Sequence, residues 1–336
     1  MDIKENLLIY LTEKYPDSTN INIEITSKIT SGWETEIYCF TLKTDNTLIF
    51  PYEDLVIRIY PSFNEKKRTH NEFKVMCWLR DKNYPVPDVL LLEIEDNPFN
   101  RPFIIMQEIE GKTLRQILES ASEEGMPYYL NKFSETFVDL HNLDLSDFPC
   151  SELGLPKITV SNFFEMYSLL MEERLKANNL EKLLPILDWI KKGSSQVKVD
   201  RISVIHGDFH PDNILVDNNG KFIVLDWSAS MPVDFRYDLA WTMVLTRIYS
   251  NEQLKDMFFS SYESVLGNSV HNIKLFEVIA LLRRLSDIAI ILSRGSSVAG
   301  LREDTTYIIK SEKELITKLQ DLLFKYTKIK IEIPVE

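Results

Sequence analysis

The stretch "HGDFHPDNILVDNNGKFIVLDW" spans residues 206–227 and gathers polar side chains against two apolar runs. Its histidines, His206 and His210, lie four residues apart. On a helix this spacing puts both imidazoles on one face, as in zinc proteases. However, Gly207 stands where those proteases have glutamate, and Pro211 disfavours helical geometry at the residue before it. The stretch therefore argues against a zinc site and leaves a catalytic centre or a polar turn as interpretations.

The dipeptide Asn219-Gly220 lies between the two apolar runs and is the strongest short-range signal of a β-hairpin. If these two residues form the loop, Asn213 lies opposite Asp226, with Cα atoms roughly 4.5–5.5 Å apart. Amide and carboxylate oxygens that converge in this way suit Mg²⁺. Asp208 adds a second carboxylate on the turn that enters the hairpin. The alternative is that Asn213 and Asp226 merely cap the strand ends.

The chain before this stretch is rich in strands. Runs of β-branched and aromatic residues, broken by turn residues, predict an antiparallel meander followed by two further strands. Helical spacing of apolar residues predicts one helix before the meander and another after it. The predicted strands lie within 23–50, 54–60, 84–96 and 101–111, and the predicted helices span 3–15 and about 65–82.

From Thr113 onward, helical patterns dominate. The predicted helices lie at about 113–122, 127–142, 160–193, 237–249, 251–266, 270–294 and 306–326. Only the short runs "RISVIH", "ILVD" and "KFIVLD" predict strands in this part. The sequence pattern changes from strand-rich to helix-rich near Glu108–Gly111. This segregation of strands from helices predicts the α+β class.

The composition argues against several classes of protein. The chain has 336 residues and a net charge of −13, whereas general nucleic-acid binders carry a basic excess. The N-terminus is charged throughout and no run of about 18 apolar residues occurs, so neither a signal peptide nor a membrane span is expected. The cysteines, Cys39, Cys77 and Cys150, are scattered, which argues against a disulfide framework. We expect a cytoplasmic monomer or homodimer without nucleic-acid or membrane partners.

The motifs "HGDFHPDN" at 206–213 and "LDW" at 225–227 closely resemble the catalytic segment of the aminoglycoside phosphotransferase/choline kinase family, which is related to the protein kinases. The resemblance extends over roughly 22–245. It implies a two-lobed, protein-kinase-like α+β fold. In such a fold an antiparallel-sheet lobe at 1–109 binds the nucleotide, and a mainly helical lobe at 110–336 carries catalysis and the substrate.

The order of aspartate, asparagine and aspartate in these motifs is that of kinases generally. By this resemblance, Asp208 orients the substrate hydroxyl and accepts its proton. Asn213 and Asp226 would hold the Mg²⁺ that bridges the nucleotide phosphates. We expect His206 and His210 to shape the loop through hydrogen bonds.

The run "LVIRIY" aligns with the strand that carries the family's phosphate-binding lysine, but this chain has Arg58 at that position. Because Ile57 and Ile59 flank it, Arg58 points to the opposite face of the strand. Glu72 matches the helix glutamate that pairs with this cation in the family. A guanidinium can fork onto phosphate oxygens, so we expect Arg58 to bind phosphate. The alternatives are a solvent-facing strand cation and, for Glu72, a surface helix charge.

The segment "SGWETEIYCF" at 31–40 stands where the family has its nucleotide-covering turn. It holds one glycine, Gly32, which makes it a poor glycine-rich loop. Glu34 and Glu36 would repel phosphates if they pointed inward, so we expect both to face solvent. An ordinary hairpin turn is the alternative.

The segment "FIIMQEIEG" matches the family's connector between the lobes. By this resemblance Met106 would flank adenine, and the Gln107 carbonyl and the Ile109 amide would be its backbone hydrogen-bond partners. The apolar alternation alone indicates only a strand. In the same way, Asp238 is expected to brace the catalytic loop, unless it merely favours a helix N-terminus. His141 is expected to be a structural hydrogen-bonding residue.

Only about a dozen residues separate Asp226 from the helix predicted near Tyr237. Protein kinases carry a long activation segment here. A small-molecule alcohol is therefore the expected phosphate acceptor, with ATP or GTP as the donor. The alternatives are a nucleotide-binding regulatory protein (a pseudokinase) without transfer activity and a kinase for choline, homoserine or a macrolide.

The side chains around the acceptor hydroxyl would decide its identity. An aminoglycoside needs acidic groups, whereas a quaternary amine such as choline prefers an aromatic cage. The acidic candidates are Glu165, Glu172, Glu173, Glu181 and Glu263, and the aromatic candidates are Tyr167, Phe235 and Trp241.

Overall fold

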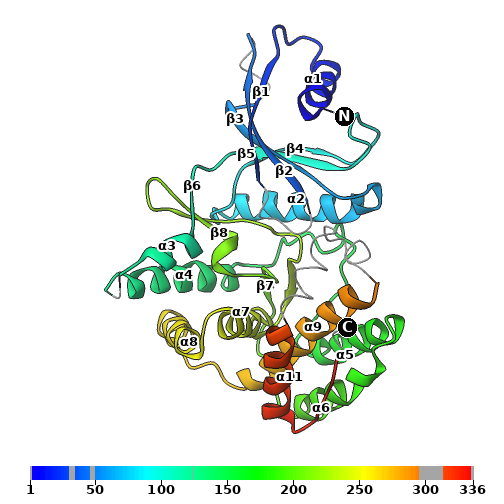
Figure 1. Ribbon diagram of the computed structural model, residues 1–336, viewed down its shortest axis with the longest axis vertical. Helices are drawn as coiled ribbons and strands as arrows, with labels where there is room; N and C mark the ends of the chain where they lie inside the picture. The colour runs from blue at the N-terminus through cyan, green and yellow to red at the C-terminus, as the bar shows by residue number, and fades with distance from the viewer. Residues whose placement is uncertain (1, 30–34, 46–49, 123, 295–312, 334–336) are drawn as a thin grey trace.

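The protein has two lobes, one built on a sheet and one built on helices (Figure 1). The computed structural model describes residues 2–29, 35–45, 50–122, 124–294 and 313–333. The predicted α+β class with segregated strands and helices is confirmed, and the change falls where the sequence texture changes.

The N-terminal sheet is antiparallel throughout, as predicted for the meander. Alternate residues of each strand supply opposite faces, because side chains along a strand point to the two sides of the sheet in turn. Thus Ile105 packs with the first helix, whereas Ile104 packs with the second. In spatial order the strands are β1 (Asn22–Ile29), β2 (Glu36–Lys43), β3 (Asp54–Ile59), β5 (Phe103–Gln107) and β4 (Val89–Glu93).

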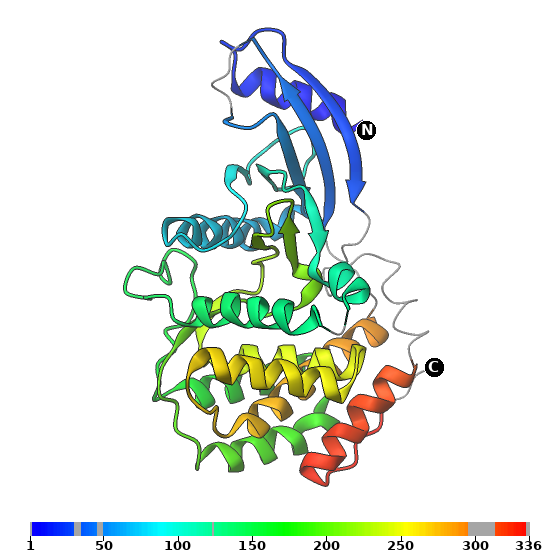
Figure 2. The same cartoon turned by 90° about the vertical axis from the view of Figure 1, so that its left-hand side faces the viewer.

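Two helices cover this sheet. Helix α1 (Ile3–Lys14) buries Leu7 and Leu11 on one face. Helix α2 (Lys66–Asp81) covers the other face and lies between the sheet and the helical lobe, as Figure 2 shows. A short 3₁₀ turn, Phe63–Glu65, leads into α2. The lower surface of the sheet, where β3 meets α2, therefore faces the helical lobe.

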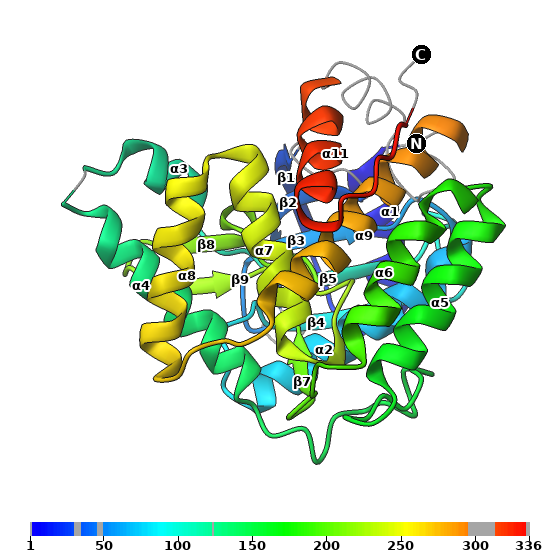
Figure 3. The ribbon, with the colours of Figure 1, turned by 90° about the horizontal axis from the view of Figure 1, so that it is seen from below.

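The C-terminal lobe packs its helices around a large apolar core. Helix α9 lies between α7 and α6, as seen from below in Figure 3. The helices are α3 (Leu114–Ser120), α4 (Met126–His141), α5 (Phe163–Ala177), α6 (Leu184–Ser194), α7 (Phe235–Tyr249), α8 (Glu252–Leu266), α9 (Ile273–Arg294) and α11 (Lys313–Thr327). Among the described helices, none combines the length and apolarity needed to cross a membrane.

One predicted helix is divided. The stretch 160–193 contains α5 and α6, separated by a turn and the 3₁₀ segment Glu181–Leu183. Asn179 adopts a left-handed φ of 56°, which ends the first helix in a way that an asparagine tolerates. The start of the last predicted helix, before Lys313, lies outside the described residues.

Short strands line the junction of the lobes. Strand β6 (Gly111–Thr113) pairs with β8 (Ile214–Asp217), which pairs with β9 (Phe222–Val224). Strand β7 (Ser203–Ile205) pairs with β10 (Met231–Val233). The sequence did not predict β6 and β10, because each has three residues and shows no period.

The hairpin forms, but the predicted register is wrong by one residue. Ile214 pairs with Val224, and the Leu225 amide donates to the Asn213 carbonyl over 2.8 Å. Asn213 therefore lies opposite Leu225 and not opposite Asp226. The strand ends before Asp226, which adopts a left-handed φ of 61°.

The loop chemistry explains this register. The Asp217 carboxylate accepts the amides of Asn219 and Lys221, each over 2.8 Å, and the Gly220 amide donates to the Asp217 carbonyl over 2.9 Å. Gly220 has a φ of 81°, as expected for the last residue of a three-residue hairpin loop. The side chain of Asp217 thus favours a loop one residue longer than the Asn-Gly pair alone predicts.

Candidate active site

The loop from β7 to β8 is held by a buried carboxylate on α7. Asp238 accepts the backbone amides of His206 over 2.7 Å and of Gly207 over 2.9 Å. Gly207 has a φ of 83°, and a Cβ there would lie 2.6 Å from the carbonyl oxygen of Ala229. The predicted bracing role of Asp238 is confirmed, although the residue also lies in the first turn of its helix.

Two of the histidines are structural, as expected. The His206 ring contacts the Leu225 carbonyl over 2.8 Å and the Asp208 amide over 3.2 Å, which fixes the turn between the two strands. His141 is buried, and its Nδ1 lies 2.8 Å from the hydroxyl of Tyr262. Burial lowers the pKa of His141, so this ring stays neutral at pH 7.

Asp208 has different partners for its two carboxylate oxygens. The Trp241 indole donates to Oδ1 over 2.7 Å, and His210 Nε2 lies 3.3 Å from Oδ2. Although burial opposes both shifts, the pair holds the pKa of Asp208 well below its usual range and raises the pKa of His210 to about 9. At neutral pH Asp208 is therefore an ionised carboxylate, the form that can accept a proton.

His210 is closer to the chemistry than the sequence indicated. Besides Asp208, it faces Asp212, whose carboxylate oxygen Oδ2 lies 3.5 Å from its Nδ1. The interpretation of His210 as only a shaper of the loop is thus incomplete. Its positive charge sits beside the predicted catalytic carboxylate because Pro211 turns the chain there.

The predicted metal ligands lie at the ends of the hairpin strands. The Asn213 side-chain amide donates to the Asp208 carbonyl over 2.9 Å, which leaves its Oδ1 available. Asp226 accepts the Ser228 hydroxyl over 2.9 Å with Oδ1, and its Oδ2 lies 3.1 Å from Arg58. Amide and carboxylate oxygens are ligands that Mg²⁺ prefers.

The donor set fits a magnesium ion that relies on other ligands as well. Among the described residues, no three His, Cys, Asp or Glu side chains are grouped so that they could hold a metal. Mg²⁺ commonly takes one or two protein oxygens and completes its shell with phosphate and water. Asn213 and Asp226 fit this pattern, and the zinc interpretation of His206 and His210 finds no support.

Arg58 and Glu72 form a buried ion pair. The guanidinium contacts Glu72 over 2.8 Å, the Thr35 hydroxyl over 3.1 Å and, across the lobes, Asp226. The second Glu72 oxygen accepts the Tyr60 hydroxyl. Burial opposes it, but Asp226 and Glu72 raise the pKa of Arg58 above its usual range. Neither residue is solvent-facing, so both alternatives stated for them are wrong.

The connector between the lobes offers a free backbone donor. The Gln107 amide bonds the Asp88 carbonyl over 2.9 Å, whereas no described residue accepts the amide of Ile109. Met106 is 8% exposed and packs among the apolar residues of the α2 side. This donor fits the expected contact of Ile109 with a nucleotide base.

The covering turn is only partly described. Gly32 and Glu34 lie outside the described residues. Glu36 lies in β2, where it binds Arg101 over 2.6 Å, and this pairing lowers the pKa of its carboxyl against the effect of burial. Arg101 thus already compensates the charge of Glu36, which reduces the repulsion of phosphates expected for this residue.

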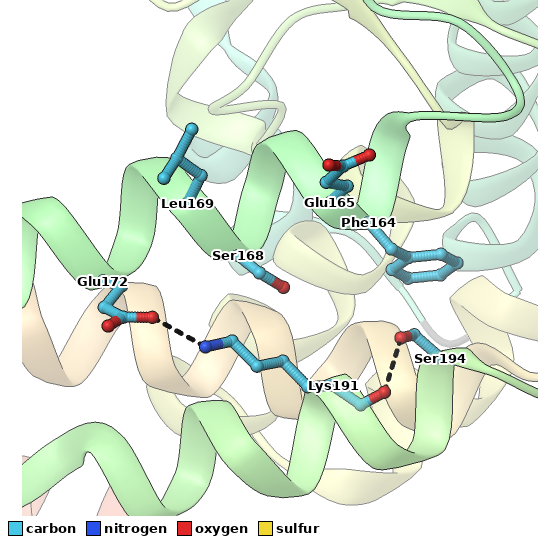
Figure 4. Close-up of a pocket in the computed structure, with 7 residues that line it drawn as sticks. All are labelled: Phe164, Glu165, Ser168, Leu169, Glu172, Lys191 and Ser194. Carbon is cyan, nitrogen blue, oxygen red and sulfur yellow. Dashed lines mark hydrogen bonds and ion pairs between the residues drawn. The ribbon is translucent and has the colours of Figure 1, made fainter.

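The acidic acceptor candidates do not gather at Asp208. Glu165 and Glu172 line a hollow of about 390 Å³ between α5 and α6, and Figure 4 shows Glu172 bound to Lys191. Lys176 neutralises Glu172 further. Of the remaining candidates, Glu263 accepts the amide of Val270, and Glu173 and Glu181 are exposed.

The sequence missed the roles of Trp241 and Arg283. Trp241 was considered only for an aromatic cage, yet it binds Asp208 directly. Arg283 donates to the Gly207 carbonyl over 2.8 Å and stacks on Trp241. The only signal for Trp241 was its place one turn after Asp238 on an expected helix. Arg283 had none, since it lies far along the chain from every motif.

Comparison with known proteins links this geometry to a family. The model of the family described as the phosphotransferase enzyme family matches residues 26–266, more than half of the chain. Among curated proteins, the chain is 26% identical over 223 residues to acyl-CoA dehydrogenase family member 11 of Gallus gallus, a match that covers 64% of the chain. The match covers 26% of that relative, so the chain spans about a quarter of its length.

Solved structures share the fold at low identity. A thermostable mutant of aminoglycoside phosphotransferase APH(4)-Ia, in complex with ADP and hygromycin B, is 15% identical, with a TM-score of 0.62 over 98% of each chain. The GDP complex of an aminoglycoside 2′-phosphotransferase-IIIa mutant is 15% identical, with a TM-score of 0.61 over 97% of each chain. A candidate aminoglycoside phosphotransferase of Ralstonia eutropha JMP134 is 17% identical, with a TM-score of 0.64. The match covers 94% of this chain and 98% of that one.

Proposed function

Because this chain belongs to the phosphotransferase enzyme family, we propose that it is a kinase that transfers the γ-phosphate of ATP or GTP to the hydroxyl of a small molecule. The solved relatives bind ADP and GDP, which supports a nucleotide donor. We also propose that residues 1–109 form the nucleotide-binding lobe and residues 110–336 the catalytic and substrate-binding lobe.

The observation that carries this proposal is the state of Asp208. Its carboxylate is ionised beside His210, and the Trp241 indole fixes its orientation. A group in this state can orient an acceptor hydroxyl and take its proton as the phosphorus–oxygen bond forms. The neighbouring Asn213 is tied to the Asp208 carbonyl, so base and metal ligand move together.

The other residues would position the nucleotide. Arg58, fixed by Glu72, is a permanent cation that can contact phosphate oxygens. Ile109 supplies a free amide to the base, and Met106 flanks it. Mg²⁺ held by Asn213 and Asp226 would neutralise charge on the transferring phosphoryl group. In this scheme catalysis comes from positioning and electrostatics, without a covalent enzyme intermediate.

The test is the Asp208→Asn variant. We expect it to remain folded and to bind Mg²⁺ and AMP-PNP as the wild type does in calorimetry. Its transfer rate, measured by mass spectrometry across an alcohol library, should fall about a thousandfold or more, since a general base contributes on the order of 10²–10⁴. Asp147→Asn, at a surface aspartate paired with Lys82, is the control and should keep the wild-type rate. Wild-type turnover in Asp208→Asn would refute the assigned role.

A second candidate function is nucleotide sensing without transfer. The contact of Arg58 with Asp226 favours it, because the arginine occupies one oxygen of a carboxylate that Mg²⁺ would need. Calorimetry with ATP and Mg²⁺, followed by the transfer screen, separates the two. Binding without phosphorylation of any alcohol would favour the sensor.

A further inference from the structure

Arg283 lies next to the proposed catalytic base, and the proposed binding of nucleotide and metal gives this cation no role. We infer that the acceptor of the proposed transfer carries an anionic group, a carboxylate or a phosphate ester, and that Arg283 binds this group. The inference rests on the proposed function, because it concerns the second substrate of the same site. It commits to a negatively charged acceptor, in contrast to cationic aminoglycosides or choline.

The position of Arg283 is fixed by two contacts. Its guanidinium carbon lies 3.9 Å from the centre of the Trp241 ring, and its Nη1 donates to the Gly207 carbonyl over 2.8 Å. Trp241 in turn donates to Asp208. The cation is therefore held one side chain away from the carboxylate that would receive the hydroxyl proton. If an acceptor binds Asp208 through its hydroxyl, a functional group close to that hydroxyl would contact Arg283.

Arg283 forms no close ion pair with the described residues, although Asp208, Asp238 and Asp287 attract its charge at longer range and help to raise its pKa against the effect of burial. Throughout the described part of the chain, no carboxylate lies within 4.0 Å of its guanidinium nitrogens. Asp287, one turn further along α9, is bound by Arg174 instead. Arg283 is only partly buried, so its remaining N–H groups can reach a ligand. A guanidinium in this situation is suited to bind a carboxylate or phosphate with two hydrogen bonds.

A second donor lies beside it. Tyr237 is one turn before Trp241 on α7, so the two rings share a face of the helix. The Arg283 guanidinium lies 5.8 Å from the Tyr237 ring centre. Nothing in the described ranges bonds the Tyr237 hydroxyl, and this residue is half-buried. Together these residues offer a cation and a hydroxyl-bearing ring close to one another.

The same geometry disfavours a cationic acceptor. The face of Trp241 that could hold a quaternary ammonium is already covered by Arg283. Phe235, another candidate for a cage, stacks on Tyr262 at an interplanar angle of 15°. A second positive charge placed beside Arg283 would be repelled, since like charges in contact cost several kcal/mol at interfaces.

The test compares matched acceptors in the full-length protein with Mg²⁺ and ATP. The probes are D-glycerate, its neutral analogue glyceramide, glycerol 3-phosphate, choline and kanamycin. We expect kcat/KM for at least one of the anions to exceed that for glyceramide at least tenfold. Whichever anion is preferred, glycerate or glycerol 3-phosphate, identifies the group as carboxylate or phosphate. Higher kcat/KM with choline, kanamycin or glyceramide than with both anions would overturn the inference.

The Arg283→Gln variant removes the charge, and a comparison of anionic with neutral acceptors separates charge from loop support, because lost support of Gly207 would affect both acceptors alike. We expect it to lose at least tenfold in kcat/KM with the anion, mainly through KM. The kcat/KM for glyceramide should fall much less than that for the anion, and the affinity for AMP-PNP should not change. Arg284→Gln, which removes the neighbouring guanidinium that bonds the Tyr249 hydroxyl, is the matched control and should behave as the wild type. An equal loss with anionic and neutral acceptors would assign Arg283 a purely structural role.

Failure of the proposed function has a different signature. If no acceptor is phosphorylated, the transferase proposal fails. Calorimetry then tests the anion site separately, by titrating the anions into the protein with Mg²⁺ and AMP-PNP. Binding of D-glycerate or glycerol 3-phosphate that weakens at least tenfold in Arg283→Gln would retain the site. Absence of binding by both anions would overturn it.

Discussion

His210 and Trp241 set the state of Asp208 through opposite oxygens of one carboxylate. The indole is a neutral donor that fixes direction, whereas the imidazolium is a charge that favours the ionised form. A proton taken by Asp208 would therefore be held weakly and pass on readily. The residue-scale arrangement suits a group that accepts a proton late in phosphoryl transfer rather than a strong base.

The charge of His210 predicts a pH-dependent stability. Its pKa rises from 6.5 to about 9 on folding, because Asp208 and Asp212 outweigh the effect of burial. A raised folded-state pKa stabilises fully below the unfolded value, and this stabilisation is lost as pH rises through about 9. We expect His210→Gln to reduce the free energy of unfolding by about 1–2 kcal/mol at pH 6. This is less than the shift alone implies, since the Asp208 side chain is 41% exposed and water screens the pair.

Urea titrations at pH 6, 8 and 10 measure this difference. The gap between wild type and His210→Gln should shrink toward zero at pH 10. A gap that stays constant over this range would show that His210 acts by packing or hydrogen bonding alone. The lowered pKa of Asp208 gives a stabilisation that is fully present at neutral and alkaline pH and is lost only in acid, so it does not change across the series from pH 6 to pH 10.

At the scale of elements, the loop between β7 and β8 depends on one glycine for its shape. Both Gly207 and Gly220 have a positive φ, 83° and 81°, but their surroundings differ. A Cβ at Gly207 would meet the Ala229 backbone, whereas a Cβ at Gly220 would meet nothing within 4 Å. The two positions therefore separate backbone strain from steric conflict.

We expect Gly220→Ala to cost about 1 kcal/mol of unfolding free energy, which is the strain of a left-handed alanine. Gly207→Ala should cost at least about 3 kcal/mol, because the Ala229 carbonyl must also move. It should also lower turnover strongly, since Asp208 follows directly. Chemical denaturation and the transfer assay measure both effects. Equal costs at the two positions would show that the loop relaxes freely.

The hairpin illustrates how a local signal can be right in kind and wrong in register. The Asn-Gly pair marked the turn, but the Asp217 side chain bound two loop amides and lengthened the loop by one residue. The pairing predicted for Asn213 and Asp226 therefore does not form, and each side chain is fixed by other contacts. Asn213 is fixed by the Asp208 carbonyl, and Asp226 turns by its left-handed φ. Side-chain bonds within a loop are not visible in a pattern of apolar residues.

At the scale of the whole molecule, the lobes are joined by polar contacts beside the proposed metal site. Arg58 of the sheet lobe binds Asp226 of the helical lobe, and Arg68 on α2 donates to the Ser228 hydroxyl over 3.0 Å. Asp226 is thus a ligand candidate and a link between lobes. Binding of Mg²⁺ and nucleotide there would replace or reinforce a contact that already holds the lobes together.

We expect Mg²⁺ with AMP-PNP to stabilise the wild type in thermal unfolding, by about 2.7 kcal/mol at a ligand concentration a hundredfold above Kd. Asp226→Asn should lose most of this Mg²⁺-dependent gain, because an amide replaces the carboxylate ligand. Asp147→Asn, a surface aspartate paired with Lys82, is the control and should keep the full gain. The same shift in Asp226→Asn as in the wild type would exclude Asp226 as a metal ligand.

The sequence by itself determined the segregated α+β class and most of the elements, whereas the two-lobed arrangement and the proposed roles of Asp208, Asn213 and Asp226 were implied by its resemblance to a known family. The class and the elements depend on local order: residue period, turn chemistry and short spacings along one chain. Tertiary structure alone decided the hairpin register, the contact of Arg58 with Asp226, and the stack of Arg283 on Trp241 beside Asp208. Such contacts join residues far apart in the chain, and their geometry exists only once strands and helices have packed against one another.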